Sequence, residues 1–200
     1  ATTHLGRAAD LSVDLSDHLI AITAGFSGTD LMLFGATEGE GDVVVVVRGP
    51  PNKIAVRRKV RMAGVWVNGP SANFDNIPSL YIVRANRALD DIIGAGMRRA
   101  MGIGFDAFLV RAAQPLQPGE KVTYREALIR LKRGSGLYSE ETGIQFVSDR
   151  LFRTNIRFPA SVATGDYRVD VYLIRDGWVI NSQTTPLRVT KAGVGAAIYD

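Results

Sequence analysis

Asp42-Val43-Val44-Val45-Val46-Val47-Arg48-Gly49 is the stretch that decides the fold of this chain. Successive side chains of a β-strand point to opposite sides, so five consecutive valines leave the strand without a polar face. Valine also favours extended backbone, and the run is bounded by Gly39-Glu40-Gly41 before it and by Gly49-Pro50-Pro51 after it. We therefore expect a central strand that is covered on both faces.

Similar but shorter apolar segments surround this strand. Strand-like patterns cover residues 18–24, 29–36, 53–61, 64–68, 79–84, 151–158, 166–174, 178–180 and 185–190. Their spacing of roughly 8–12 residues over much of the chain, with Gly, Pro and Asn at the turns, is typical of an antiparallel sandwich. Gly165-Asp166-Tyr167 also resembles a tyrosine corner, in which the tyrosine hydroxyl is tied back to the preceding backbone.

Between the two groups of strands the apolar period changes to that of a helix. Apolar residues fall on one face over residues 89–101, where Asn86 can cap the start and Gly102 can end the helix. A second helix is predicted over Tyr124–Arg133, with Thr123 at the first position of a capping box.

The predicted fold is thus mainly β: an Ig-like antiparallel β-sandwich with a two-helix insertion at about 86–136, α+β overall. The sandwich is expected to span residues 17–190, after an N-terminal lead-in over residues 1–16. Two packed subdomains built from the same strands are the competing layout. The length of 200 residues allows either arrangement without stabilising cross-links.

Few residues of this chain are suited to catalysis or metal binding. The absence of cysteine excludes disulfides, thiolate zinc sites and cysteine nucleophiles. His4 and His18 are the only histidines, and the Met97/Met101 spacing is more typical of core packing than of a copper site. The sequence has no phosphate-binding loop and no nucleophile elbow. We therefore expect no enzyme and no catalytic, cofactor or metal residues.

The net charge of +4 includes one dense basic run, Lys53, Arg57, Arg58, Lys59 and Arg61. Its cations alternate approximately with apolar residues, so the simplest interpretation is the solvent face of a strand. Lys53, Arg57, Lys59 and Arg61 are in phase on a two-residue repeat, whereas Arg58 points the other way unless a bulge intervenes. A phosphate or anionic-lipid patch is the alternative, and no nucleic-acid partner is expected.

Exposed aromatic side chains would offer a second kind of recognition surface. Trp66 and Trp178 lie on alternating strands, and we expect both in the core. Leu137 and Tyr138 lie in the glycine-rich segment that follows the second predicted helix. That segment is a candidate contact site, although a plain connecting loop is the simpler interpretation.

Several turn and strand motifs together resemble one family, the conserved transmembrane proteins of alphaproteobacteria. The motifs are spread over almost the whole chain and include Gly25-Phe26-Ser27-Gly28, Gly64-Val65-Trp66-Val67-Asn68, Leu151-Phe152-Arg153 and Gly165-Asp166-Tyr167-Arg168-Val169. The resemblance implies a secreted N-terminus, a periplasmic body and a single C-terminal membrane helix, and it carries no assigned catalytic residues. Residues 191–200 would then be a linker toward that anchor.

These observations lead to two hypotheses about function. The first is a non-enzymatic accessory or protein-interaction domain in the periplasm, anchored to the inner membrane and bound to a membrane protein partner. The alternative is a solute- or anionic-headgroup-binding module that serves as an accessory to a membrane transporter. The candidate interaction surface comprises Leu137, Tyr138, Lys53, Arg57, Lys59 and Arg61.

Overall fold

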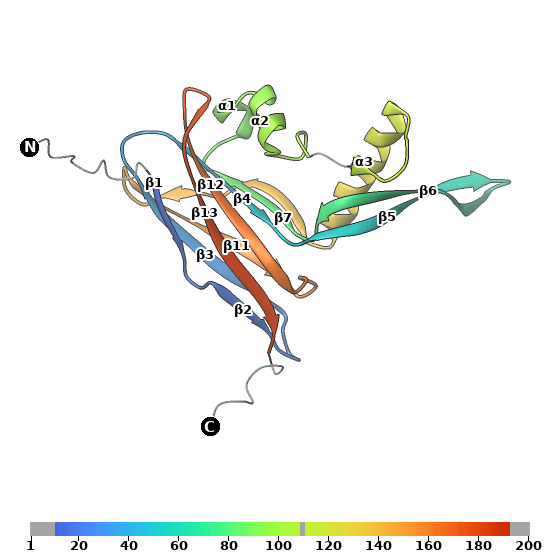
Figure 1. The fold of residues 1–200 in the computed structure, drawn as a ribbon, viewed down its shortest axis with the longest axis horizontal. Helices are drawn as coiled ribbons and strands as arrows, with labels where there is room; N and C mark the ends of the chain where they lie inside the picture. Colours follow the sequence, from blue (N-terminus) through green and yellow to red (C-terminus); the bar gives the residue numbers. More distant parts are fainter. Residues whose placement is uncertain (1–10, 109–110, 193–200) are drawn as a thin grey trace, which may run out of the picture.

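The computed structural model describes residues 11–108 and 111–192. It contains two large β-sheets, a third small sheet and three helices (Figure 1). The four-stranded sheet has the order β1 (Leu11–Leu15), β3 (Gly28–Thr37), β11 (Leu151–Pro159), β10 (Gln145–Phe146). The six-stranded sheet has the order β2 (Leu19–Ile22), β13 (Trp178–Lys191), β12 (Gly165–Arg175), β4 (Asp42–Arg48), β7 (Tyr81–Ala85), β9 (Tyr138–Thr142). The third sheet has the order β5 (Pro51–Met62), β6 (Val65–Pro78), β8 (Arg111–Ala112), and the helices are α1 (Leu89–Ile92), α2 (Ala95–Met101) and α3 (Pro118–Gly134).

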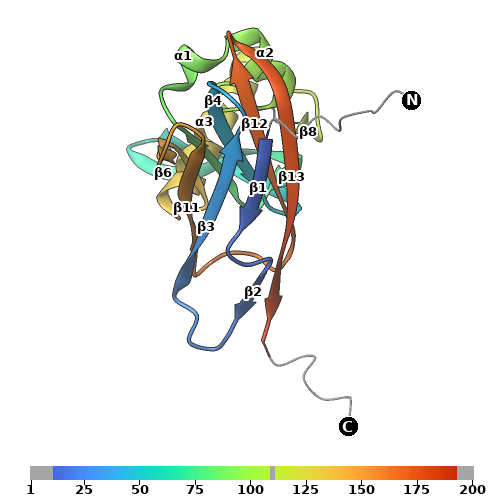
Figure 2. The same cartoon turned by 90° about the vertical axis from the view of Figure 1, so that its left-hand side faces the viewer.

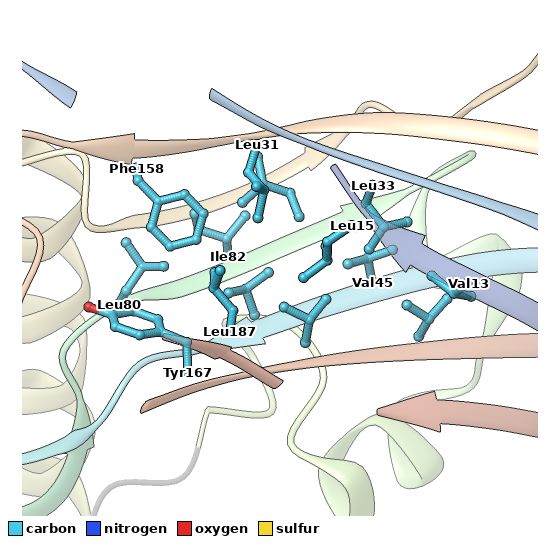
Figure 3. Packing of buried hydrophobic residues seen from close by; sticks show 14 of the residues in the cluster. Val13, Leu15, Leu31, Leu33, Val45, Leu80, Ile82, Phe158, Tyr167 and Leu187 are labelled. Carbon is cyan, nitrogen blue, oxygen red and sulfur yellow. The ribbon is translucent and has the colours of Figure 1, made fainter. Parts of the chain in front are cut away.

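The valine strand β4 lies inside the six-stranded sheet, between β12 and β7, and divides the interior into two cores. Val43, Val45 and Val47 face the core between the two large sheets, where Figure 3 shows Val45 among side chains from both sheets. Val44 and Val46 face the opposite core, which the small sheet and the helices complete. All five valines are fully buried, so the prediction of a strand covered on both faces is confirmed.

A mainly β sandwich with added helices is confirmed. Figure 2 views the molecule from the side of β1 and β3, with the strands of the second sheet behind them. Not every pairing is antiparallel: β2 runs parallel to β13, and β9 runs parallel to β7. The β7–β9 pairing brings the chain back to the sandwich after the helices.

The helical segment differs from the prediction in three details. Gly94 is extended and separates α1 from α2, so there are three helices instead of two. Asn86 does not cap a helix, because its side chain accepts a hydrogen bond from the Val43 N–H at 2.9 Å. The capping box of α3 is formed by Gln117 and Glu120, several residues before Thr123. The predicted left-handed cap at Gly102 is confirmed by its φ of 63°.

The prediction that residues 1–16 form a loose lead-in is wrong for Leu11–Leu15, which form strand β1. Leu11, Val13 and Leu15 alternate with exposed residues along β1 and are buried in the core between the large sheets. Their alternation is a strand signal that the polar composition of the segment obscured. Residues 1–10 lie outside the described part of the chain, as do residues 193–200 of the predicted linker.

The corner before β12 provides a test of this part of the sandwich. Tyr167 is buried, and its hydroxyl donates a hydrogen bond of 2.6 Å to the carbonyl oxygen of Ala163, four residues upstream. Burial raises the pKa of the Tyr167 hydroxyl, which therefore remains a donor at neutral pH. We expect Tyr167→Phe to lower the free energy of unfolding by roughly 1–3 kcal/mol, because the Ala163 carbonyl loses its partner.

Urea unfolding monitored by circular dichroism measures this effect. Tyr172→Phe is the matched control, since Tyr172 lies on the same strand and is only half-buried. Equal stability of the Tyr167→Phe variant and the unmodified chain would contradict a stabilising role for the corner hydrogen bond.

Candidate functional site

The feature that distinguishes this sandwich is a hairpin arm, formed by β5, β6 and the turn Ala63-Gly64 between them. Figure 1 shows the arm extending away from the large sheets to the right of the molecule. Both turn residues have positive φ, 49° at Ala63 and 82° at Gly64, as a two-residue type I′ turn requires. Asparagine or glycine is usual at the first position, so Ala63 holds a conformation that its side chain disfavours.

The root of the arm is firmly packed. Val56, Ala72 and Phe74 are buried in the core that also receives α3. The Phe74 ring lies 6.1 Å from the Tyr124 ring of α3, and the Tyr124 hydroxyl donates a 3.2 Å hydrogen bond to the Pro70 carbonyl. An isolated two-stranded hairpin is marginally stable in water, so these contacts supply the support that the arm needs.

The outer part of the arm, residues 57–71, contains no buried residue. At its tip three large apolar side chains are mostly in solvent: Met62 is 64%, Val65 64% and Trp66 65% exposed. Single exposed apolar residues are ordinary on a protein surface. Here Met62 and Val65 pair across the strands and Trp66 lies beside the same turn, and such a local concentration of exposed apolar side chains is typical of interaction sites.

Strand pairing divides the outer arm into two faces. Arg61 pairs with Trp66 and Lys59 with Asn68, whereas Val60 pairs with Val67 and Met62 with Val65. Directly opposite residues share a face, so one face carries the cations and Trp66, and the other is mainly apolar. The strand register shifts between Arg57 and Lys59, and the extra residue of this bulge lies in β6. The side chains of β5 therefore keep their alternation, which places Arg58 on the apolar face.

The positive charge of the chain is concentrated in this arm. Residues 51–74 contain five Lys or Arg and no acid, whereas the rest of the chain has 19 Lys and Arg against 20 Asp and Glu. Lys53, at the root, lies 3.8 Å from Asp75. The adjacent helix α3 adds five cations and two acids. Arm and helix therefore form the basic end of the molecule.

Tyr138 does not lie on an exposed loop, which corrects the prediction of a contact site there. It opens β9 and is buried, its ring 5.8 Å from that of Tyr81 and 5.4 Å from that of Phe108. Its hydroxyl donates a 2.8 Å hydrogen bond to the carbonyl of Pro78, the last residue of β6, and burial raises its pKa. Leu137 is half-buried beside it. Both residues support the root of the arm and do not join its exposed surface.

The prediction that both tryptophans lie in the core is wrong. Trp66 and Trp178 are each 65% exposed, and each lies next to a hairpin turn. Alternation places a residue on one face of a strand, but it does not say whether that face is covered. Proximity to the turn was the available signal, because the end of a hairpin commonly extends beyond the sheet that supports it.

Two further surface hollows lie away from the arm. One, a cleft of 640 Å³, has an acidic lining that includes Asp42, Asp90 and Asp91. Asp42 is already bound to Arg87 through a 2.6 Å contact, and that hydrogen bond lowers its pKa. An apolar groove of 380 Å³ lies on the outer side of the four-stranded sheet, lined in part by Phe34 and Leu151. Over residues 11–108 and 111–192 no three His, Cys, Asp or Glu side chains come together as metal ligands.

The chain belongs to the family described as "Putative transmembrane protein (Alph_Pro_TM)", whose model matches residues 10–200. The resemblance to alphaproteobacterial transmembrane proteins is thereby confirmed, and the family description associates the chain with a membrane. A search of curated proteins found no match. In the part of the chain that the structure describes, none of the helices has the length and apolarity needed to cross a bilayer.

Proposed function

We propose that this family member is a non-enzymatic recognition domain, tethered to the inner membrane and facing the periplasm, which contacts its membrane partner through the hairpin arm. The observation that carries the proposal is the exposed tip of Met62, Val65 and Trp66 on a basic arm whose root is built into the core. The family description supports an association with a membrane, and the periplasmic side is part of the proposal. An accessory role beside a membrane protein, such as a transporter, fits such a domain.

The construction of the arm supports a recognition role. Exposed apolar side chains at the tip add nothing to the core, yet β8, α3 and Tyr138 are all arranged to hold the root of the arm in place. A rigid scaffold that presents a protruding segment is the usual arrangement of a binding surface. The large acidic cleft lacks this construction, since its Asp42 carboxylate is engaged by Arg87.

The chain provides its own control for a test of this function. Trp178 has the same exposed fraction as Trp66, but it lies at the turn between β12 and β13, which has no basic run. A photo-crosslinking amino acid is placed at position 66 or at position 178 of the full-length protein, in cells of the source organism. We expect irradiation to join position 66, and not position 178, to a component of the membrane fraction.

Equal labelling from the two positions would contradict the proposal, as would an absence of adducts from position 66. Mass spectrometry of the adduct distinguishes a protein partner from a lipid. Either identity supports recognition through the arm.

A further inference from the structure

We infer that the arm docks on a bilayer: Met62, Val65 and Trp66 enter the interface of an anionic leaflet, and the basic residues behind them bind its headgroups. This inference rests on the proposed function and names the partner of the same surface. It requires an apolar tip of suitable shape, cations at the right depth and no opposing charge. The structure provides each of these.

The tip is convex and apolar. The three side chains surround a two-residue turn, and none of the hollows described above is lined by the arm. A protein partner would need a matching pocket for this wedge, whereas a bilayer interface deforms around it. Tryptophan is particularly suited to that position, because its ring is apolar and its N–H stays hydrogen-bonded among the headgroups.

The cations lie at the depth that headgroups would occupy. A strand advances about 3.3 Å per residue, so Lys59 lies about 10 Å behind Met62, and Arg61 lies closer to the tip. Interfacial elements bury their apolar side roughly 5–10 Å into the boundary between headgroups and acyl chains. With Met62 at that depth, Lys59 reaches the phosphates, whereas Arg61 lies at the turn itself, where its Nε donates a 3.3 Å hydrogen bond to the Gly64 carbonyl. The long Lys59 side chain can extend toward the charged layer while its stem remains near apolar surface.

The charge of the arm favours an anionic leaflet over a neutral one. Residues 51–74 contain no acid, and the one acid of the arm, Asp75, lies at the root, 3.8 Å from Lys53, so nothing along the outer part repels lipid phosphates. Each cation near such a surface strengthens binding about fivefold, and this contribution weakens as salt screens it. The turn of the β12–β13 hairpin differs, because Asp176 lies next to Trp178 and Arg175 is bound to the carbonyls of Glu38 and Glu40.

Tryptophan fluorescence tests the inference, because the chain has only two tryptophans. Trp178→Phe leaves Trp66 as the sole reporter, and Trp66→Phe leaves Trp178. Each variant of the full chain is mixed with vesicles of phosphatidylcholine, or of phosphatidylcholine and phosphatidylglycerol in a two-to-one ratio. We expect a blue shift, and quenching by brominated acyl chains, only for Trp66 and only with the anionic vesicles.

Two further variants separate charge from insertion. Arg57→Gln, Lys59→Gln and Arg61→Gln combined should weaken vesicle binding about 100-fold, at about fivefold for each charge. Arg99→Gln, Arg150→Gln and Arg153→Gln combined remove the same net charge from exposed sites elsewhere and should change binding far less. Trp66→Ala should abolish insertion, and both arm variants should keep the circular dichroism spectrum, since their positions are exposed.

Three results would overturn docking on lipid. These are an unshifted Trp66 spectrum with anionic vesicles, an equal shift of Trp178, and equal binding by the two charge variants. If vesicles do not bind but position 66 crosslinks to a protein in cells, the inference fails and the proposed function stands. If neither experiment gives a signal from position 66, both fail.

Discussion

Val46→Asp is expected to prevent folding altogether. Val46 is fully buried at the middle of β4, opposite Asp170 of β12 and Val83 of β7. A carboxylate at this position would be desolvated and next to another acid, and the nearby cation, Arg48, is already engaged by Asp170. The cost of burying an uncompensated charge is several kcal/mol, comparable with the total stability of about 5–15 kcal/mol that a domain possesses.

Expression and far-UV circular dichroism provide the measurement, with inclusion bodies or an unfolded spectrum as the expected result. Val46 is a sharper test than Val45, because Arg84 lies opposite Val45 and could pair with the new acid. Val65→Asp is the control, since it places the same change on an exposed strand position and should leave the fold intact. A soluble Val46→Asp protein that melts cooperatively would refute the two-core description of β4.

Asp170→Ala should have the second largest effect, a loss of about 3–5 kcal/mol of unfolding free energy. Asp170 is buried and accepts hydrogen bonds from Arg48 at 2.7 Å, Thr184 at 2.7 Å and Arg168 at 3.0 Å. Arg48 also donates to the carbonyls of Met101 and Gly102, at 3.1 and 3.0 Å, and so ties the end of α2 to the sheet. Without Asp170 the Arg48 guanidinium keeps its desolvation cost and loses its counter-ion.

Urea denaturation measures the loss, and Asp166→Ala is the matched control. Asp166 lies on the same strand, 3.4 Å from Arg188 in a solvent-exposed pair, so its removal should cost less than about 1 kcal/mol. Arg48→Met combined with Asp170→Leu should recover much of the stability, because the double change leaves no buried charge unpaired and the remaining cation, Arg168, is mostly exposed. Similar losses from Asp170→Ala and Asp166→Ala would show that the buried network contributes no more than an exposed pair.

Local patterns predicted the parts of this fold that depend on neighbouring residues. The valine run of β4, the stop at Gly102 and the hydrogen bond of Tyr167 each follow from residue type and immediate context. The parallel pairings of β2 and β9 could not be predicted in this way, because they join segments far apart in the chain.

At the candidate site, too, the sequence predicted the features that depend on neighbouring residues and not those that depend on residues far apart in the chain. The alternation of β5 predicted which residues share a face, but a strand within a large sheet has the same pattern as one in a projecting arm. Whether Trp66 is covered depends on how far the supporting core extends, and that core is built from distant segments such as α3. Tyr138 was misplaced for a related reason, since Tyr81 and Phe108 enclose it from outside its own glycine-rich segment.

The position of β4 has a consequence for how the chain reaches its native state. One neighbour, β7 (Tyr81–Ala85), is synthesised well before the other, β12 (Gly165–Arg175). Until β12 arrives, a five-valine segment with high β-propensity has an unpaired edge, which is the pattern that promotes self-association of unfolded chains. Asp42 and Arg48 bracket this segment, and in a parallel in-register stack each would lie against its own copy, so that like charges would oppose this mode of self-association.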